Sequence, residues 1–209
     1  RNSLVLAVLV FVTQGSFNYI ATLLPIFTVQ ALGWSDQAYS NYFATASLVG
    51  GIGGMLIGGI LIDRFGKIRM MNIYLVILIC LTIGFVLLKL QWASTWFIVS
   101  FMIVYQLLYV FTCIGVFAIA MQCCWKKVSA SQFTIYMTIS NMGRIVGAKL
   151  IGPIKFQFSW EYTVLAFAIM MLLGFVIIQF LHMKNHLKHL DDLETEFTNK
   201  DLSPLMDKT

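Results

Sequence analysis

Charge is scarce in this sequence. Only 11% of its 209 residues are Asp, Glu, Lys or Arg, whereas 59% are hydrophobic, and the mean hydropathy is +0.85. Residues 2–35 contain no charged side chain at all. This composition excludes a water-soluble globular domain, because the apolar stretches are too long and too numerous to share one buried core. We therefore expect an all-α membrane protein.

Clusters of reactive side chains are also lacking. The sequence shows no nucleophile–base arrangement and no phosphate-binding loop, so we expect no catalytic residue, no enzyme activity and no cofactor. His182, His186 and His189 are spaced i, i+4 and i+7 and could share one helical face, but lysines lie among them and no carboxylate joins them within one turn, so we favour an ordinary polar helix and expect no metal site. The cysteines lie in or at the ends of apolar stretches, and we interpret them as reduced packing residues: Cys80, Cys113, Cys123 and Cys124.

The net charge of +5 comes from short loops between the apolar stretches, which argues against nucleic acid as a partner. These loops sort by charge into two sides. One side carries Arg64, Lys67, Arg69, Lys126, Lys127, Lys184 and Lys188, and the other carries Asp36, Lys89, Lys155 and Glu161. The positive-inside rule predicts that the first side, with both ends of this chain, lies in the cytoplasm.

Six apolar stretches are long enough to cross a bilayer as helices. The predicted spans are residues 4–31, 37–62, 70–89, 95–122, 129–154 and 161–183. Together they form one transmembrane unit, residues 1–183, followed by a polar cytoplasmic tail, residues 184–209. Polar side chains are frequent in the first and fourth spans and rare in the third and sixth, which predicts a repeat of three helices with the polar spans as cavity walls.

The second span contains a glycine ladder and ends in a charged turn. Gly50, Gly54 and Gly58 recur every four residues, which predicts close packing of this helix against another helix. The segment that follows, Gly59-Ile60-Leu61-Ile62-Asp63-Arg64-Phe65-Gly66-Lys67-Ile68-Arg69, resembles the G-x-L-x-D-R-x-G-[RK]-[RK]-x loop of the major facilitator superfamily. Ile68 departs from that pattern. The resemblance implies one six-helix half of a transporter, with a cytoplasmic gating loop formed by Gly59, Asp63, Arg64, Gly66, Lys67 and Arg69.

Arg144 lies about fifteen residues into the fifth predicted span, near the middle of the bilayer. An arginine at that depth is costly unless it faces protein or a water-filled path. It either binds an anionic substrate through carboxylate or phosphate oxygens, which we favour, or ties helix-end carbonyls together. The other candidate substrate-binding residues are polar side chains on the first, fourth and fifth spans: Gln14, Asn18, Gln106, Tyr109, Asn141 and Lys149.

The stretch from Ser129 to Arg144, followed by Gly152-Pro153, is similar to one segment of the AmpG-type permeases, which reads S-A-T-Q-F-A-L…S-A-x-x-R…G-P. These proteins import anhydromuropeptides into the bacterial cytoplasm with protons, and the wider group includes acetyl-coenzyme A transporters. The match is loose between Arg144 and Gly152, and Lys149 departs from it. The resemblance implies the C-terminal six-helix half of such a transporter, in the bacterial inner membrane.

We therefore predict a secondary active transporter that moves a small anionic solute, anhydromuropeptide first among the candidates, by proton-coupled alternating access. The alternatives are a major facilitator transporter of another solute (organic anion, sugar, drug or acetyl-coenzyme A) and a non-transporting membrane receptor or scaffold. The chain begins at Arg1 without a methionine. Its expected partners are the anionic substrate, the lipid bilayer and an N-terminal transporter half that this chain does not contain.

Overall fold

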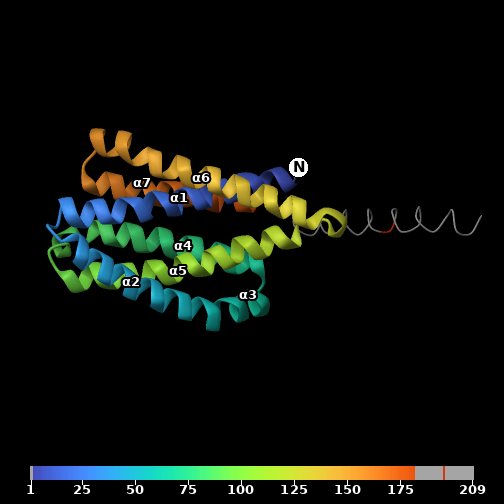
Figure 1. Ribbon diagram of the computed structural model, residues 1–209, viewed down its shortest axis with the longest axis horizontal. Coiled ribbons are helices and arrows are strands. Elements are labelled where there is room, and N and C mark those ends of the chain that lie inside the picture. Colours follow the sequence, from blue (N-terminus) through green and yellow to red (C-terminus); the bar gives the residue numbers. More distant parts are fainter. Residues whose placement is uncertain (1, 182–194, 196–209) are drawn as a thin grey trace, which may run out of the picture.

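The computed structural model describes residues 2–181 and residue 195, and this part of the chain is built of helices without strands (Figure 1). Its α-helices are α1 (Asn2–Gln30), α2 (Asp36–Gly53), α3 (Gly59–Phe65), α4 (Lys67–Leu87), α5 (Thr95–Gln122), α6 (Ser129–Gln157) and α7 (Trp160–Gln179). A π-helical segment, Gly54–Gly58, joins α2 to α3, and 3-10 turns lie at Lys89–Gln91 and Lys126–Val128. The end of the sixth predicted span and, apart from residue 195, the predicted tail lie outside the described residues.

Six long helical rods result, because α2, the π-helical segment and α3 run on as one helix. Five rods are long and apolar enough to cross a membrane: Asn2–Gln30, Asp36–Phe65, Lys67–Leu87, Thr95–Gln122 and Trp160–Gln179. The sixth, α6, has 29 residues but is more polar, since it contains Arg144, Lys149 and Lys155. It lies lengthwise beside the others (Figure 1). The all-α fold with six transmembrane helices is therefore confirmed.

The helix bounds differ most from the prediction around the charged turn. The predicted spans stop at residue 62 and resume at residue 70, because the charged residues between them were assigned to a loop. In the structure α3 continues to Phe65 and α4 begins at Lys67, so only Gly66 separates the two helices. Its φ of 90° lies in a region that glycine tolerates and other residues rarely adopt. Gly66 alone thus reverses the direction of the chain, and the charged residues of the motif lie at the end of α3 and the start of α4.

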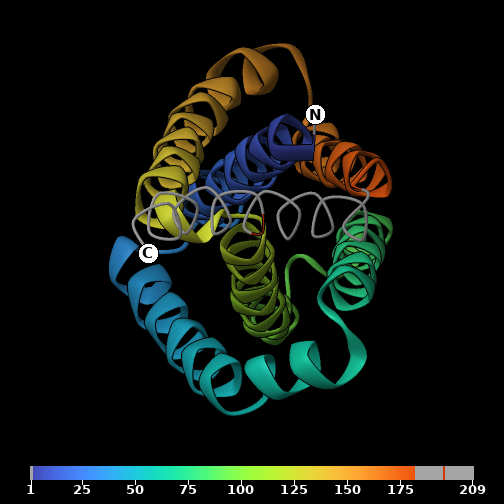
Figure 2. The same ribbon diagram turned by 90° about the vertical axis from the view of Figure 1, so that its right-hand side faces the viewer.

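The helices form two sets of three that are related by their contacts. In one set α1 packs against α6 and α7, and in the other α5 packs against α2 and α4. The contact between α4 and α7 joins the two sets, which Figure 2 shows end-on. Exchanging the first three rods for the last three maps the α1–α6 contact onto the α5–α2 contact, the α1–α7 contact onto the α5–α4 contact, and the α4–α7 contact onto itself. This pattern is what the predicted repeat of three helices requires.

The glycine ladder makes the predicted close helix contact. Gly50 faces Gln106 of α5, and a Cβ atom added to this glycine would lie 2.9 Å from the Gln106 Cγ atom. Gly54 lies against Val110 in the same way. A Cβ atom on Gly58 would lie 2.8 Å from Ile114 Cδ1 and 3.2 Å from Phe111 Cδ1. The missing side chains therefore let α2 and α5 approach closely.

The loops sort to the two ends of the bundle as predicted. Figure 1 shows the α3–α4 and α5–α6 turns, which carry Arg64, Lys67, Lys126 and Lys127, at one end. The turns at the other end carry the ion pair between Lys89 Nζ and Glu161 Oε1, 3.4 Å apart. Lys184 and Lys188 lie outside the described residues. Which end faces the cytoplasm remains a prediction.

Candidate substrate-binding cavity

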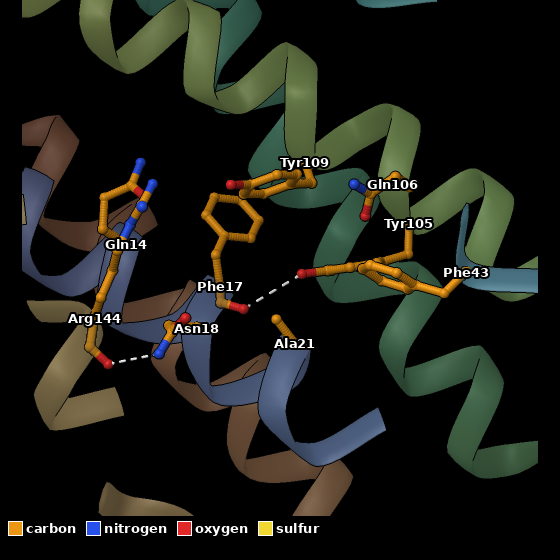
Figure 3. A pocket seen from close by; sticks show the side chains of 9 residues that line it. All are labelled: Gln14, Phe17, Asn18, Ala21, Phe43, Tyr105, Gln106, Tyr109 and Arg144. Carbon is orange, nitrogen blue, oxygen red and sulfur yellow. Dashed lines mark hydrogen bonds between the residues drawn. The ribbon is translucent and has the colours of Figure 1, made fainter. Parts of the chain in front are cut away.

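A cavity of about 220 Å³ opens between α1, α2, α5 and α6 (Figure 3). Four of its lining residues come from α1, three from α5, and one each from α2 and α6: Gln14, Phe17, Asn18, Ala21, Tyr105, Gln106, Tyr109, Phe43 and Arg144. Helices α4 and α7 contribute none. The first and fourth spans thus form most of the cavity wall, as their polar side chains predicted.

Helical spacing explains which α1 side chains line the cavity. Gln14, Phe17, Asn18 and Ala21 follow the spacing i, i+3, i+4 and i+7, so all four lie on one face of the helix. The sequence supplies this face with two amides, one aromatic ring and one small residue. The result is a wall that is polar at Gln14 and Asn18 and open at Ala21.

A second glycine crossing brings Arg144 to this wall. A Cβ atom on Gly143 would overlap the carbonyl group of Phe11, and one on Gly147 would overlap the carbonyl group of Gly15. Because both glycines lack that atom, the backbones of α1 and α6 touch. The residues next to the crossing, Gln14 on α1 and Arg144 on α6, therefore lie side by side.

Two polar contacts fix Arg144 against α1. The Gln14 Oε1 atom accepts from the Arg144 guanidinium, at 3.3 Å from Nε and 3.1 Å from Nη2. The Asn18 amide donates to the Arg144 backbone carbonyl at 2.8 Å, a bond drawn in Figure 3. Gln14 in turn donates from Nε2 to the Sγ atom of Cys113 on α5, at 3.6 Å. The guanidinium is thus held at the cavity by neutral groups.

No carboxylate neutralises Arg144 within the described part of the chain. Residues 2–181 contain three acidic side chains, Asp36, Asp63 and Glu161, and each lies near a helix end. A guanidinium has five N–H donors, and the bonds to Gln14 use only its Nε and Nη2 atoms. The Arg144 side chain is half-buried, and a cation at membrane depth without a counter-charge attracts an anion. The cavity is therefore suited to a carboxylate or phosphate group.

Aromatic rings form the wall opposite Arg144. Phe17 meets Tyr109 edge to face, with ring centroids 4.9 Å apart. The Tyr105 hydroxyl donates to the Phe17 backbone carbonyl at 3.5 Å (Figure 3), and Phe43 of α2 also lines the cavity. Gln106 lines the cavity where α5 touches Gly50. An apolar body next to a cationic end suits an amphipathic anion.

The structure gathers five of the seven predicted substrate-binding residues in one cavity. Asn141 and Lys149 are not among the lining residues; both are exposed on α6. Four lining residues were not predicted: Phe17, Ala21, Phe43 and Tyr105. Helical spacing was a usable signal for three of them, because Phe17 and Ala21 lie three and seven residues after Gln14, and Tyr105 lies four residues before Tyr109. Phe43 had none.

The predicted gating loop is well defined but makes no ion pair in the described part of the chain. Gly66 donates to the Ile62 carbonyl and accepts from Met70 N, both at 3.0 Å, which closes the α3–α4 turn. Asp63, Arg64 and Arg69 are exposed, and Lys67 is half-buried. Gly59, which belongs to the same motif, lies at the start of α3 with open space beside it. A gating role for this loop stays a prediction.

Comparison with known proteins gives one family. A profile described as Major Facilitator Superfamily matches residues 1–148, a range that ends just after Arg144 and includes every cavity-lining residue. No curated protein and no solved structure matches the chain.

Proposed function

The chain belongs to the major facilitator superfamily, and on that premise we propose that it transports a small anionic solute, which Arg144 binds in the cavity between α1, α2, α5 and α6. Members of this family are membrane transporters and not enzymes. The chain is accordingly an integral membrane transport protein, and its long apolar helices agree with this. The solute, the coupling ion and the sidedness are the proposed parts.

The observation that carries the proposal is the uncompensated charge of Arg144. The side chain lies halfway along α6 and, in the part of the chain that the structure describes, has the uncharged Gln14 oxygen as its acceptor. Taking a charge out of water costs several kcal/mol unless a partner compensates it. A solute with a carboxylate or phosphate group would supply that partner and accept two bonds from the guanidinium. A neutral sugar or drug would leave the positive charge of Arg144 uncompensated.

Among anionic solutes we propose anhydromuropeptide first. The support is the sequence similarity between residues 129–153 and the AmpG-type permeases, in which an arginine stands at the place of Arg144. Gln132, another residue of that segment, accepts a hydrogen bond from Trp125 N at 2.7 Å and so holds the α5–α6 turn. Arg144 is then the residue of this segment that faces the cavity. Acetyl-coenzyme A and other organic anions could pair with the same Arg144 charge and are the nearest alternative solutes.

The proposed mechanism is proton-coupled alternating access in the bacterial inner membrane, with the basic end of the bundle in the cytoplasm. A second six-helix half would close the cavity on the side of α2 and α6. Asn141 and Lys149 lie exposed on α6 and would contact the solute where the halves meet. The described residues place no carboxylate at the cavity, so a proton-carrying acid would belong to another part of the transporter.

Uptake of labelled anhydromuropeptide into lipid vesicles, with and without a proton gradient, tests the proposal. We expect gradient-dependent uptake by the wild-type protein and an affinity loss of about 100-fold in Arg144→Ala, because the charge pair with the solute is lost. Lys155→Ala is the matched control: this residue is a cation on the same helix, and its Nζ atom lies over the Trp160 ring, 4.2 Å from its centroid, away from the cavity. Unchanged affinity in Arg144→Ala would reduce Arg144 to a structural tie.

A further inference from the structure

We propose that Gln14 is a placeholder ligand of Arg144, which the anionic solute displaces, and that Cys113 is the positioning residue that holds the Gln14 amide nitrogen in place. This inference rests on the proposed function, because it assigns a further role at the same site. It identifies the residue that accepts hydrogen bonds from the Arg144 guanidinium before the solute binds.

The Gln14 amide can meet its neighbours in only one orientation. Arg144 offers donors and no acceptor, so the amide oxygen has to face it. The amide nitrogen then faces Cys113, whose sulfur accepts from Nε2 at 3.6 Å. With an apolar residue in place of Cys113, the amide nitrogen would lose its acceptor. Arg144 therefore sets the direction of the Gln14 oxygen, and Cys113 stabilises that orientation by binding the other end of the amide.

The position of the oxygen matches that of an incoming anion. Gln14 Oε1 lies 3.3 Å from Nε and 3.1 Å from Nη2, so one atom spans the edge of the guanidinium that these nitrogens form. A carboxylate binds such an edge with two oxygens, one to each nitrogen. Solute binding at this edge must move the Gln14 oxygen away. A neutral oxygen is a suitable placeholder because it satisfies the donors without cancelling the charge that attracts the solute.

The link also connects the two three-helix sets. Gln14 and Arg144 belong to α1 and α6, whereas Cys113 belongs to α5, which packs in the other set. Displacing the Gln14 oxygen therefore perturbs a hydrogen bond that joins the two sets across the cavity. The Gln14 side chain thus takes part both in the proposed solute site and in the contact between α1 and α5.

Substitutions at Gln14 separate a placeholder from a solute contact. In Gln14→Glu a permanent carboxylate would pair with Arg144, and we expect an affinity loss of about 100-fold for the anion, the size of a buried charge-pair interaction. In Gln14→Leu the competing acceptor is absent, and we expect affinity to rise about tenfold, the worth of one hydrogen bond to a charged group. Cys113→Val should shift affinity in the same direction as Gln14→Leu but less, and Cys113→Ser, which keeps an acceptor, should restore the wild-type value.

The probes are labelled anhydromuropeptide and labelled acetyl-coenzyme A, bound to the purified protein in lipid nanodiscs whose monodisperse elution is checked for each variant. If Arg144→Ala binds a probe as tightly as the wild type, or the wild type binds neither probe, the proposed function fails and the placeholder role with it. If Arg144→Ala loses binding but Gln14→Glu does not, the placeholder role alone is overturned. A tenfold or larger loss in Gln14→Leu would also overturn it, because Gln14 would then be a solute contact.

Discussion

The Arg144 guanidinium lies at mid-helix and has the neutral Gln14 oxygen as its acceptor. Its positive charge is therefore not compensated by a carboxylate of the described residues, and the proposed function rests on this charge. The neighbouring residues are neutral donors and acceptors, each of which fixes a position without cancelling the charge. Asn18 fixes the Arg144 backbone, and Gln14 fixes the guanidinium. The site is therefore rigid and unneutralised at the same time, which is the state that favours binding of an external anion.

Buried thiols at the end of α5 give a prediction at the residue scale. Cys123 and Cys124 are buried beyond the last turn of this helix. Burial raises the pKa of the Cys123 thiol to about 11, with the adjacent Cys124 adding to the effect and Lys67 opposing it. Because the thiolate is the reactive form, we expect Cys123 to react slowly with maleimide at pH 7.5 and about tenfold faster per pH unit up to pH 10.

Mass spectrometry of the protein in vesicles would follow this labelling, with denatured protein as the rapidly reacting control. Fast labelling of folded protein at pH 7.5 would contradict the buried placement of Cys123. The same experiment reports on Cys80, which is exposed on α4 and so does not fit the packing role that its sequence context indicated.

At the scale of the helices, glycines allow close backbone contact at two helix crossings. The glycines of α2 lie against α5, and Gly143 and Gly147 of α6 lie against α1. Exchanging the two halves of the repeat relates these crossings to each other. The first crossing positions Gln106, and the second positions Gln14 and Arg144. Close backbone contact thus determines where the polar side chains of the cavity lie.

We predict that Gly143→Ala destabilises the protein by about 1–3 kcal/mol, because the added methyl group overlaps the Phe11 carbonyl and forces α1 away from α6. Anion binding should fall as well, since the Gln14–Arg144 bonds depend on this crossing. Gly51→Ala is the control: this glycine lies within α2 with open space around it, and alanine there should be neutral or stabilising. Thermal unfolding in detergent would measure both variants, and equal unfolding temperatures would refute the prediction.

The α3–α4 turn depends on a different property of glycine. Gly66 has open space around it but a φ of 90°, so Gly66→Ala is strained by its backbone and not by a clash. We expect a loss of stability of about 1–2 kcal/mol. Gly59→Ala, seven residues earlier in the same motif and at a helical φ of −64°, should cause no loss. Matching stability of the two variants in thermal unfolding would show that the turn does not require a left-handed residue.

At the scale of the whole molecule, the α4–α7 contact joins the two three-helix sets and is pinned by polar pairs at both ends. Gln179 Nε2 donates to Asn72 Oδ1 at 3.0 Å at the basic end, and Lys89 pairs with Glu161 at the other. Neither helix contributes to the cavity. We interpret this seam as the fixed part of the bundle, while the cavity side moves.

A fixed seam predicts that a cross-link across it is tolerated. Asn72→Cys and Gln179→Cys, introduced together after the native cysteines are replaced by Ala or Ser, should form a disulfide under mild oxidation. We expect uptake by the oxidised protein to equal that of the same protein after reduction, because this contact is the same in every state. Loss of uptake that reduction restores would show that the seam itself moves.

Much of this arrangement was predictable from the sequence, and the remainder depended on three-dimensional crossings. The polar faces of the first and fourth spans predicted the cavity wall, because amides in a membrane helix have to face protein or water. The partner of Arg144 was not predictable, since Gln14 meets it only where Gly15, Gly143 and Gly147 let two helices touch. Asn141 was predicted because it lies three residues before Arg144 on the same helix, and Lys149 because it is charged within the predicted span, but both are exposed on α6.

The charge preference of the Arg144 site is the most direct test of the central claim. Equilibrium binding of labelled anhydromuropeptide would be compared with binding of its carboxamide analogue, which has the same shape without the charge, in wild-type and Arg144→Ala protein. We expect the wild type to prefer the carboxylate form by about 100-fold and the variant to bind both forms with similar affinity. A preference that persists undiminished in Arg144→Ala, or a wild type that does not discriminate, would contradict the account.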